Sequence, residues 1–406
     1  MAEPSPTAAW LSIIGLNEDG LPGLGEAARA ALREADVVFG GARHLRLAAA
    51  GMAGTAHPWP SPFSVAPVLA RRGQRVAVLA SGDPMWHGVG ATLLRDLPPG
   101  EARVFPLASA ASLAAARLGW ALADITTLSL HARDIALLRP HLHPGARLIL
   151  LTSDARQPAA IASMLATSGF AGSRITLLES LGGPAERIRA TIASDFAFAE
   201  IHPLNTLGVE ILAEAQAQPL PRAPGLDDLL FQHDGQLTKR EVRAITLSAL
   251  RPYPGALLWD VGAGAGSIGI EWMLAHPGCQ AIGIEVRADR AARAAANARA
   301  LGVPGLRLVV GEAPAAFADL PAPDALFLGG GANDPGVFDA ALAALKPGGL
   351  FVANAVTLET EALLLAHHAR LGGELLRIGI TRAVAVASMT GWRPAMPVTQ
   401  WVWRKP

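Results

Sequence analysis

Short apolar runs alternate with alanine-rich stretches along most of the chain, and this alternation predicts the secondary structure. Windows such as residues 25–33 and 109–118 carry apolar side chains at helical spacing. The apolar runs of the first half predict strands at residues 10–15, 37–39, 75–80, 103–106, 126–130, 147–152 and 174–178. Because strands that alternate with helices are typical of α/β proteins, we expect a mostly parallel sheet covered by helices.

A second α/β series follows residue 220. Its apolar runs predict strands at residues 257–261, 280–285, 306–310, 325–328, 349–354 and 374–380. Between the two series, residues 213–225 (AEAQAQPLPRAPG) contain three prolines. Proline removes amide donors and disfavours helix in the preceding residue, which predicts an extended linker, although a surface loop within one domain is the alternative. We therefore expect two domains, residues 1–215 and 216–406, with the seam near residue 220.

A glycine-rich loop in the second series is the clearest candidate site. The strand predicted at 257–261 contains Asp260 near its end, and the loop after it is Gly262, Ala263, Gly264, Ala265 and Gly266. Glycines allow a tight turn and the close approach of a ligand to the backbone. About twenty residues further on, the next strand ends at Glu285, whose carboxylate is placed to accept hydrogen bonds from ribose hydroxyls. The sequence therefore predicts a nucleoside site.

The loop alone leaves the cofactor open. It is compatible with simple turn chemistry, and Gly264, Gly266 and Gly269 also satisfy the dinucleotide fingerprint G-x-G-x-x-G. Three features resemble class I methyltransferases and favour S-adenosylmethionine over NAD. They are Asp260 two residues before the first glycine, the sequence GEA at 311–313 after the third strand, and LKPGGL at 345–350 before the fifth.

The segment upstream of the loop narrows the resemblance. Residues 225–231 (GLDDLLF), 234–244 (DGQLTKREVRA) and 353–359 (ANAVTLE) are similar to precorrin decarboxylating methylases of cobalamin biosynthesis. The resemblance covers about residues 225–406 and implies a Rossmann-like class I methyltransferase fold. It implies cofactor contacts from Thr238, the loop 262–266, Glu285 and Ala313. Thr238 followed by Glu241 also predicts a capping box that opens a helix.

Four short motifs mark the first half. They are FGGARHL at 39–45, ASGDP at 80–84, ASAAS at 108–112 and SLHAR at 129–133. Glycine, aspartate and proline are turn formers, so a single motif of this kind could be only a turn. In this order the motifs resemble tetrapyrrole methylases, in particular the branch that acts on late precorrins. The usual SLHGR of that family reads SLHAR here.

The tetrapyrrole methylase resemblance implies an N-terminal fold of two α/β subdomains with S-adenosylmethionine bound between them. It places near the cofactor Asp83, Trp86, Ser109, Ala110 and Thr152. Candidates for the substrate trough are Arg43, His44, His131 and Arg133. Arginine can bind a carboxylate of the substrate through two hydrogen bonds. For each histidine, a purely structural role is the alternative.

Together the two resemblances imply a methyltransferase that uses S-adenosylmethionine on a tetrapyrrole, a late precorrin. The first domain would methylate carbon 5, and the second would methylate carbon 15 and remove carbon dioxide from the ring C acetate. The alternative hypothesis is that one domain is a non-catalytic scaffold and the other is a single methyltransferase for another small metabolite. Because related domains often associate, we also expect a homo-oligomer.

The charge balance and the amino-acid composition argue against several classes of partner. The 34 basic residues balance 34 acidic ones and only 5% of residues are aromatic, which argues against nucleic acid and membrane surfaces as partners. One cysteine, Cys279, excludes an internal disulfide, and His141 and His143 lack a third ligand, so we predict no metal site. A mean hydropathy of +0.32 raises the question of a membrane, but no apolar run reaches the ~18 residues of a spanning helix. The first ten residues contain Glu3 and two prolines rather than a secretory signal, so we expect a cytoplasmic protein.

Overall fold

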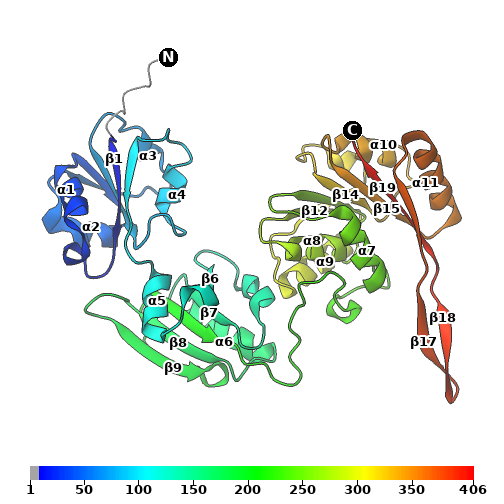
Figure 1. The fold of residues 1–406 in the computed structure, drawn as a ribbon, viewed down its shortest axis with the longest axis horizontal. Helices are drawn as coiled ribbons and strands as arrows, with labels where there is room; N and C mark the ends of the chain where they lie inside the picture. The colour runs from blue at the N-terminus through cyan, green and yellow to red at the C-terminus, as the bar shows by residue number, and fades with distance from the viewer. Residues whose placement is uncertain (1–8) are drawn as a thin grey trace. The chain divides into compact units, whose positions relative to one another are not determined.

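The structure is a computed structural model that describes residues 9–406 (Figure 1). The chain divides into two compact units. The first contains the described residues up to Ile135 together with His143–Gln218, and the second contains Ala136–Leu142 and Pro219–Pro406. The main change of unit therefore falls inside the proline-containing segment 213–225. The expected absence of a secretory signal concerns a segment that lies mostly outside the described residues.

The first unit begins with a five-stranded parallel sheet in the order β3-β2-β4-β1-β5. Its strands are β1 Leu11–Leu16, β2 Val37–Gly40, β3 Thr55–Pro58, β4 Val76–Ser81 and β5 Ala102–Phe105. Its helices are α1 Glu26–Glu34, α2 Ala42–Ala48, α3 Ala66–Leu69 and α4 Val89–Leu93. Every residue of β1 is buried, as expected for a central parallel strand covered on both faces.

The second sheet of this unit is mixed, which contradicts the expectation of a mostly parallel arrangement. Its order is β6-β7-β10-β8-β9, and only β6 and β7 are parallel. The strands are β6 Thr126–Ser129, β7 Arg147–Leu151, β8 Arg174–Glu179, β9 Arg187–Ile192 and β10 Asn205–Glu210, and the helices are α5 Ala110–Leu118 and α6 Gln157–Thr167. The connection from β8 to β9 is too short for a parallel crossover, and the hydrophobic pattern carries no information about strand direction.

The second unit contains a seven-stranded sheet in the order β13-β12-β11-β14-β15-β19-β16. Its strands are β11 Leu257–Val261, β12 Gln280–Glu285, β13 Arg307–Val310, β14 Ala325–Leu328, β15 Leu350–Ala355, β16 Glu374–Ile378 and β19 Val398–Arg404. The first five strands in this order are parallel, and β19 inserts antiparallel between β15 and β16. The order reverses between β11 and β14, the position at which open α/β sheets bind ligands.

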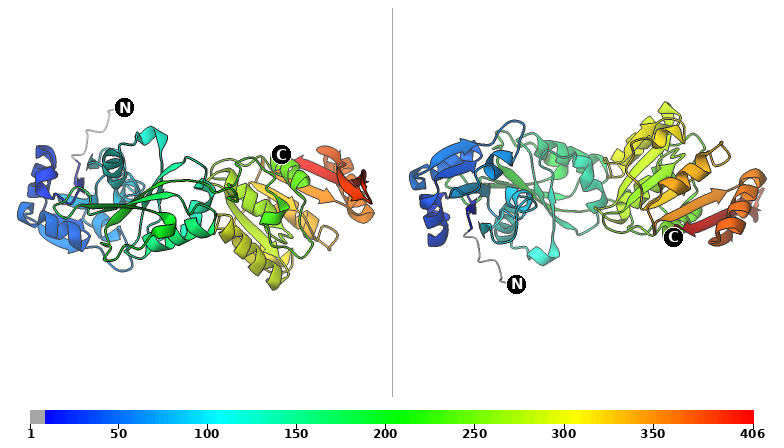
Figure 2. Two further views of the ribbon diagram at one scale, coloured as in Figure 1. Left: turned by 90° about the horizontal axis from the view of Figure 1, so that it is seen from below. Right: turned by 90° about the horizontal axis from the view of Figure 1, so that it is seen from above.

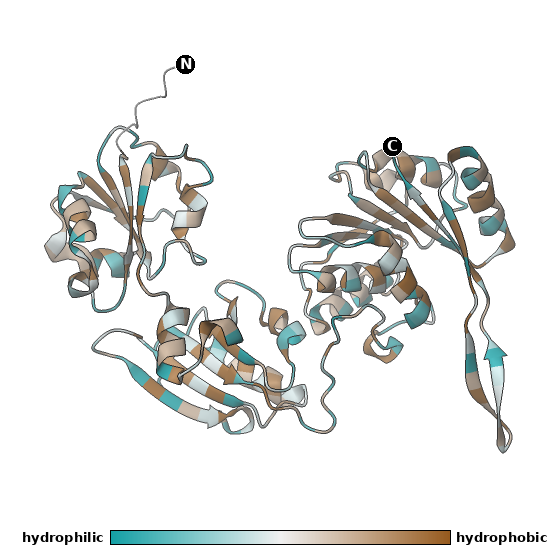
Figure 3. Cartoon of the chain, in the orientation of Figure 1, coloured by the Kyte–Doolittle hydropathy of each residue, from teal (hydrophilic) through white to brown (hydrophobic). Residues whose placement is uncertain are grey.

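Helices cover both faces of this sheet (Figure 2). They are α7 Arg240–Leu250, α8 Ser267–Ala275, α9 Ala288–Ala300, α10 Val337–Ala344 and α11 Leu358–Leu371. Leucines of α7 and Trp272 of α8 belong to one apolar cluster, whereas Phe338 of α10 and Leu364 of α11 belong to the other. Apolar residues accordingly concentrate in the strands between the two helical layers (Figure 3).

A two-stranded hairpin, β17 Thr381–Val386 and β18 Met389–Pro394, forms a sheet of its own and was not expected from the sequence. It follows β16 and leads into β19. Large apolar side chains are exposed on or beside it, including Met389, Trp392 and Met396.

Trp401 of β19 provides a test of the core. The indole is fully buried, lies 5.8 Å from the ring of Phe338 and 5.6 Å from that of Phe351, and donates a hydrogen bond to the Gly372 carbonyl at 2.9 Å. We expect Trp401→Ala to lower the free energy of unfolding of the second unit by ~3–5 kcal/mol, because it leaves a large cavity. Trp392→Ala, at a side chain that is 76% exposed, should change it by no more than ~0.5 kcal/mol. Urea unfolding of both variants measures the difference, and equal effects would contradict this description of the core.

Candidate functional site

The glycine loop leaves β11 at the point where the strand order reverses. Gly262 and Gly264 have φ values of 74° and 55°, in the left-handed region. A Cβ atom on Gly262 would lie 2.8 Å from the Gly330 nitrogen, so this position requires glycine. The amides of Gly262 and Ala263 donate to the Ile284 carbonyl at the end of β12, at 2.9 and 3.1 Å. The loop is therefore fixed against the strand that carries Glu285.

The Glu285 carboxylate lies at the glycine loop, as the sequence predicts. Its Oε2 accepts a hydrogen bond from the Gly264 amide at 2.8 Å, and its Oε1 accepts one from the Arg287 amide at 3.0 Å. The residue is only 4% exposed. Each carboxylate oxygen can accept a further bond, which leaves acceptor capacity for the hydroxyls of a ribose. The turn that contains Ala313 lies nearby, because the Gly311 amide donates to the Glu285 carbonyl at 3.1 Å.

The Asp260 side chain is hydrogen-bonded to the helix that follows the glycine loop. It is 2% exposed, and its Oδ2 accepts a hydrogen bond from the Gly269 amide in α8 at 3.0 Å. Burial and, to a smaller extent, the negative charge of Glu285 raise the pKa of its carboxyl to about 7, although the hydrogen bond from the Gly269 amide acts in the opposite direction. Asp260 thus joins β11 to the first turns of α8.

The capping box expected at Thr238 and Glu241 is wrong. Helix α7 begins at Arg240, so its N-cap is Lys239, which makes no side-chain capping bond. Glu241 instead forms an ion pair with Arg382 of β17, a long-range partner that local sequence does not reveal. The segment before the helix does approach the loop: the Gln236 carbonyl lies 3.7 Å from the position of a Cβ on Gly264.

A cavity of about 60 Å³ in the first unit is lined from both of its sheets. Leu16, Arg43 and Gly82 come from the first sheet and its helices, and Ala110 and Asn205 come from the second half of the unit. Ligand pockets usually exceed roughly 300 Å³, so this cavity can hold only part of a nucleoside cofactor. It lies between the two subdomains, and of the residues expected near the cofactor its lining includes Ala110.

Arg43 and His44 lie together beside this cavity. Arg43 forms an ion pair with Glu18, and its Nη2 donates to Ser81 Oγ at 3.0 Å and to His44 Nε2 at 2.9 Å. Burial and, to a smaller extent, the charge of Arg43 together lower the pKa of His44 to about 4, so the imidazole is neutral at pH 7. Glu18 and Ser81 were not recognised as site residues in the sequence, although Ser81 is the last residue of β4 and Glu18 lies two residues after the end of β1.

Three remaining candidates of the first unit make hydrogen bonds within that unit, two of them to near neighbours in the sequence. Thr152 Oγ1 donates to the Asn205 carbonyl at 2.7 Å, and Ser109 Oγ caps α5 by accepting from the Ser112 amide at 3.1 Å. Asp83 Oδ1 accepts from the Met85 amide at 2.8 Å. Trp86 is exposed.

His131 and Arg133 are exposed on the turn after β6. No hydrogen bond or ion pair described in the structure joins either of them to Arg43 or His44. The structure therefore brings together half of the expected substrate-trough residues.

Within residues 9–406, no group of three or more His, Cys, Asp or Glu side chains is arranged to hold a metal ion. No helix in the described part of the chain is long and apolar enough to cross a membrane.

Comparison with known proteins identifies both units. A family model described as tetrapyrrole (corrin/porphyrin) methylases matches residues 11–197, and one described as a precorrin methyltransferase domain matches residues 229–405. The fold and these two matches therefore define a two-domain methyltransferase.

Relatives match this chain along nearly its whole length. A precorrin-6Y C(5,15)-methyltransferase [decarboxylating] of Sinorhizobium sp is 57% identical over 100% of this chain and 98% of the relative. One from Mycobacterium tuberculosis is 40% identical over 96% and 98% of the two chains. A solved C-terminal domain of precorrin-6Y C5,15-methyltransferase from Rhodobacter capsulatus is 48% identical and covers 46% of this chain and 100% of its own, with a TM-score of 0.44. The chain belongs to the family of decarboxylating precorrin-6Y C(5,15)-methyltransferases.

Asp260 gives a pH-dependent prediction. Its pKa in the folded protein lies above its ordinary value, so the stability that its protonated form contributes is complete below about pH 4 and is lost as the pH rises toward 7. Asp260→Asn keeps an acceptor for the Gly269 amide and removes this loss. We expect the variant to exceed the wild type in stability by ~2 kcal/mol at pH 8 and by much less at pH 4.5. Denaturant unfolding at both pH values tests this, with exposed Asp339→Asn as control, and a difference that does not change with pH would contradict it.

Proposed function

We propose that this chain converts precorrin-6Y to precorrin-8 by methylation at carbons 5 and 15, with S-adenosylmethionine as methyl donor and with loss of carbon dioxide from the ring C acetate. The observation that carries the proposal is the Glu285 carboxylate, buried against the Gly264 amide at the reversal of strand order. The 57% identity to a relative of that name over the full chain supports the substrate.

The second unit is suited to hold the methyl donor. Gly262 and Gly264 expose backbone without a Cβ, and Glu285 has free acceptor capacity for ribose hydroxyls. Thr238 and Ala313 lie on segments beside the same loop. When bound, S-adenosylmethionine supplies an electrophilic methyl carbon. The work of the chain is then to hold the reacting carbon in line with that methyl, since orientation alone can lower a barrier by several kcal/mol.

Decarboxylation needs little additional machinery in this proposal. An electron-rich meso carbon of the macrocycle is the nucleophile, so methylation of carbon 15 requires no strong protein base. The methylated macrocycle carries an iminium cation next to the acetate, and that cation accepts the electron pair released with carbon dioxide. Asp260 and Glu285, the carboxylates at the loop, are both engaged with backbone amides. The acetate therefore has to be positioned rather than protonated.

The first unit is proposed to methylate carbon 5. Arg43 supplies a cation for a carboxylate of the substrate. Its planar guanidinium is already paired with Glu18, and the substrate carboxylate can share it. Neutral His44 holds Arg43 and Ser81 in place through its Nε2. Ala110 and Asn205 face the adjoining cavity, in which part of the methyl donor would lie.

We also propose that the enzyme works in the cytoplasm as a homo-oligomer. A single cysteine without a disulfide partner is typical of reducing compartments. The exposed Met389 and Trp392 of the hairpin supply apolar surface that an assembly could bury.

Mass spectrometry of the product tests the proposal. Wild-type enzyme with precorrin-6Y and S-adenosylmethionine should yield a product with two added methyl groups and one carbon dioxide lost. Glu285→Ala should leave one added methyl and no loss of carbon dioxide, because methylation of carbon 15 creates the iminium. Arg43→Met should reduce methylation at carbon 5 by at least ~10-fold, since a charge-assisted contact is worth roughly 1.5–3 kcal/mol.

The matched controls are Glu374→Ala and Arg46→Met, at exposed positions of the same two units. Carbon dioxide loss by Glu285→Ala without the second methyl would show that decarboxylation does not depend on methylation. A wild-type product with only one new methyl group would support the scaffold hypothesis for one unit.

A further inference from the structure

Arg243 is a fully buried arginine to which the proposed mechanism gives no role. It lies in α7, and its side chain has no exposed surface. Burial of a guanidinium is costly unless every donor is engaged, because the group cannot lose its charge in a protein. The hydrogen bonds that offset the cost of burying Arg243 therefore show which parts of the chain this side chain holds in place.

The guanidinium of Arg243 joins helix α8 to the segment that precedes α7. Its Nε donates to Glu271 Oε1 in α8 at 2.5 Å. Its Nη1 donates to Asp228 Oδ1 at 3.1 Å and to the Thr238 carbonyl at 2.5 Å, and its Nη2 donates to the Leu226 carbonyl. Most of these bonds thus go to residues 225–238, which we call the entry segment, and one goes to the helix that begins at the glycine loop.

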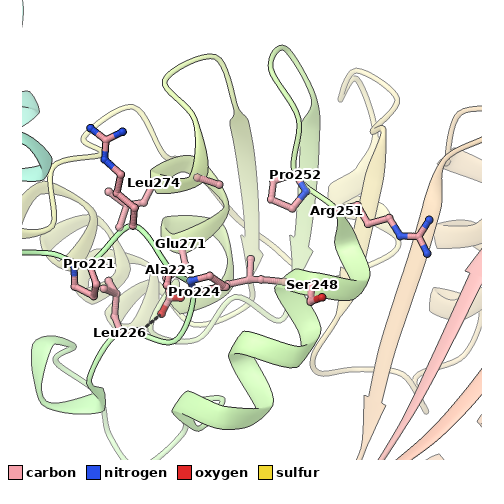
Figure 4. A pocket seen from close by; sticks show the side chains of 12 residues that line it. Pro221, Ala223, Pro224, Leu226, Ser248, Arg251, Pro252, Glu271 and Leu274 are labelled. Carbon is pink, nitrogen blue, oxygen red and sulfur yellow. Dashed lines mark hydrogen bonds between the residues drawn. The ribbon is translucent and has the colours of Figure 1, made fainter. Parts of the chain in front are cut away.

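Glu271 completes the attachment from the other side. It accepts hydrogen bonds from the amides of Gly225 at 2.6 Å and Leu226 at 3.0 Å, and its side chain is 2% exposed. Figure 4 shows Glu271 bonded to Leu226 at the edge of a cavity of about 210 Å³ that Pro221–Leu226, α7 and α8 enclose. This cavity includes Leu274 and Ala275 at the far end of α8, roughly two turns from the glycine loop. It therefore lies behind the entry segment and is separate from the nucleoside site.

The other end of the entry segment is bound beside the glycine loop. Asn297 of α9 exchanges hydrogen bonds with the backbone of Gln232, at 2.9 Å in both directions, and donates to the Ala265 carbonyl at 2.9 Å. Asp234 forms an ion pair with Arg290 at 2.8 Å. Gln236 then approaches Gly264, as described above. The entry segment consequently runs from the Arg243–Glu271 pair to the edge of the nucleoside site, with Thr238 between that edge and α7.

We infer that Arg243 is the positioning residue that sets the affinity of the second unit for S-adenosylmethionine, by fixing the entry segment so that Thr238 lies at the glycine loop. The inference rests on the proposed function. Arg243 reaches the carbonyl of Thr238 itself, and through Glu271 it reaches the helix that follows Gly266, so one side chain sets the distance between the two walls of the site. A lysine could satisfy Glu271 but could not reproduce the fork that also reaches Thr238 and Leu226.

The test measures carbon dioxide release by the full-length enzyme with precorrin-6Y as the concentration of S-adenosylmethionine is varied. Arg243→Lys keeps a charge against Glu271 and should fold. Its KM for S-adenosylmethionine in this step should rise about tenfold, while kcat at saturation changes less than about twofold, because lost positioning weakens binding of the cofactor. Methylation at carbon 5, carried out by the first unit of the same chain, should keep its KM and serves as an internal control.

Two further variants separate positioning from general stability. Asp228→Asn weakens one bond of Arg243 and leaves the buried pair with Glu271 intact, so it should raise the same KM by about two- to fivefold even if Arg243→Lys fails to fold. Leu364→Ala, in the core on the opposite face of the sheet, should lower the melting temperature and leave the KM unchanged. An unchanged KM in Arg243→Lys or Asp228→Asn, or an equal rise in Leu364→Ala, would overturn the inference. A wild-type enzyme that releases no carbon dioxide would overturn the proposed function, and the inference with it.

Discussion

The buried ion pair between Arg243 and Glu271 is the interaction on which the second unit's site depends. Neither charge can be left unpaired in an interior that water does not reach, so the surrounding backbone must supply the remaining bonds. Those bonds fix the entry segment to α7 and α8, and α8 starts at the glycine loop. Because the buried charges of Arg243 and Glu271 must both be paired, they fix the entry segment beside the glycine loop.

The first unit uses a related pair in a different way. Arg43 and Glu18 are partly exposed at a cavity, so a carboxylate from outside can share the guanidinium. Arg243 has no exposed surface and is available to no ligand. Burial therefore separates an arginine suited to bind a polycarboxylate substrate from one suited to hold the protein in shape.

Many strands and the position of Glu285 could be predicted from the sequence, because they depend on the hydrophobic pattern and spacing of neighbouring residues. Strands β11 and β12 were predicted with their observed bounds, and Glu285 lies at the glycine loop as expected from its spacing. The missed elements depend on distant partners. Two arginines of β9 pair with the buried Glu179 of β8, and β19 inserts between β15 and β16 from the far end of the chain. Lys239 rather than Thr238 occupies the N-cap position of α7 and makes no side-chain capping bond, and the buried surroundings of Arg243 come from segments that only folding brings together. The individual roles of the cofactor and substrate residues stay predictions.

In the proposed function, one chain contains two independent sites for the same methyl donor. Calorimetric titration of the full-length protein with S-adenosylmethionine counts these sites. We expect two molecules bound per chain in the wild type and one in Glu285→Ala. A single site in the wild type, or two sites retained in Glu285→Ala, would contradict it.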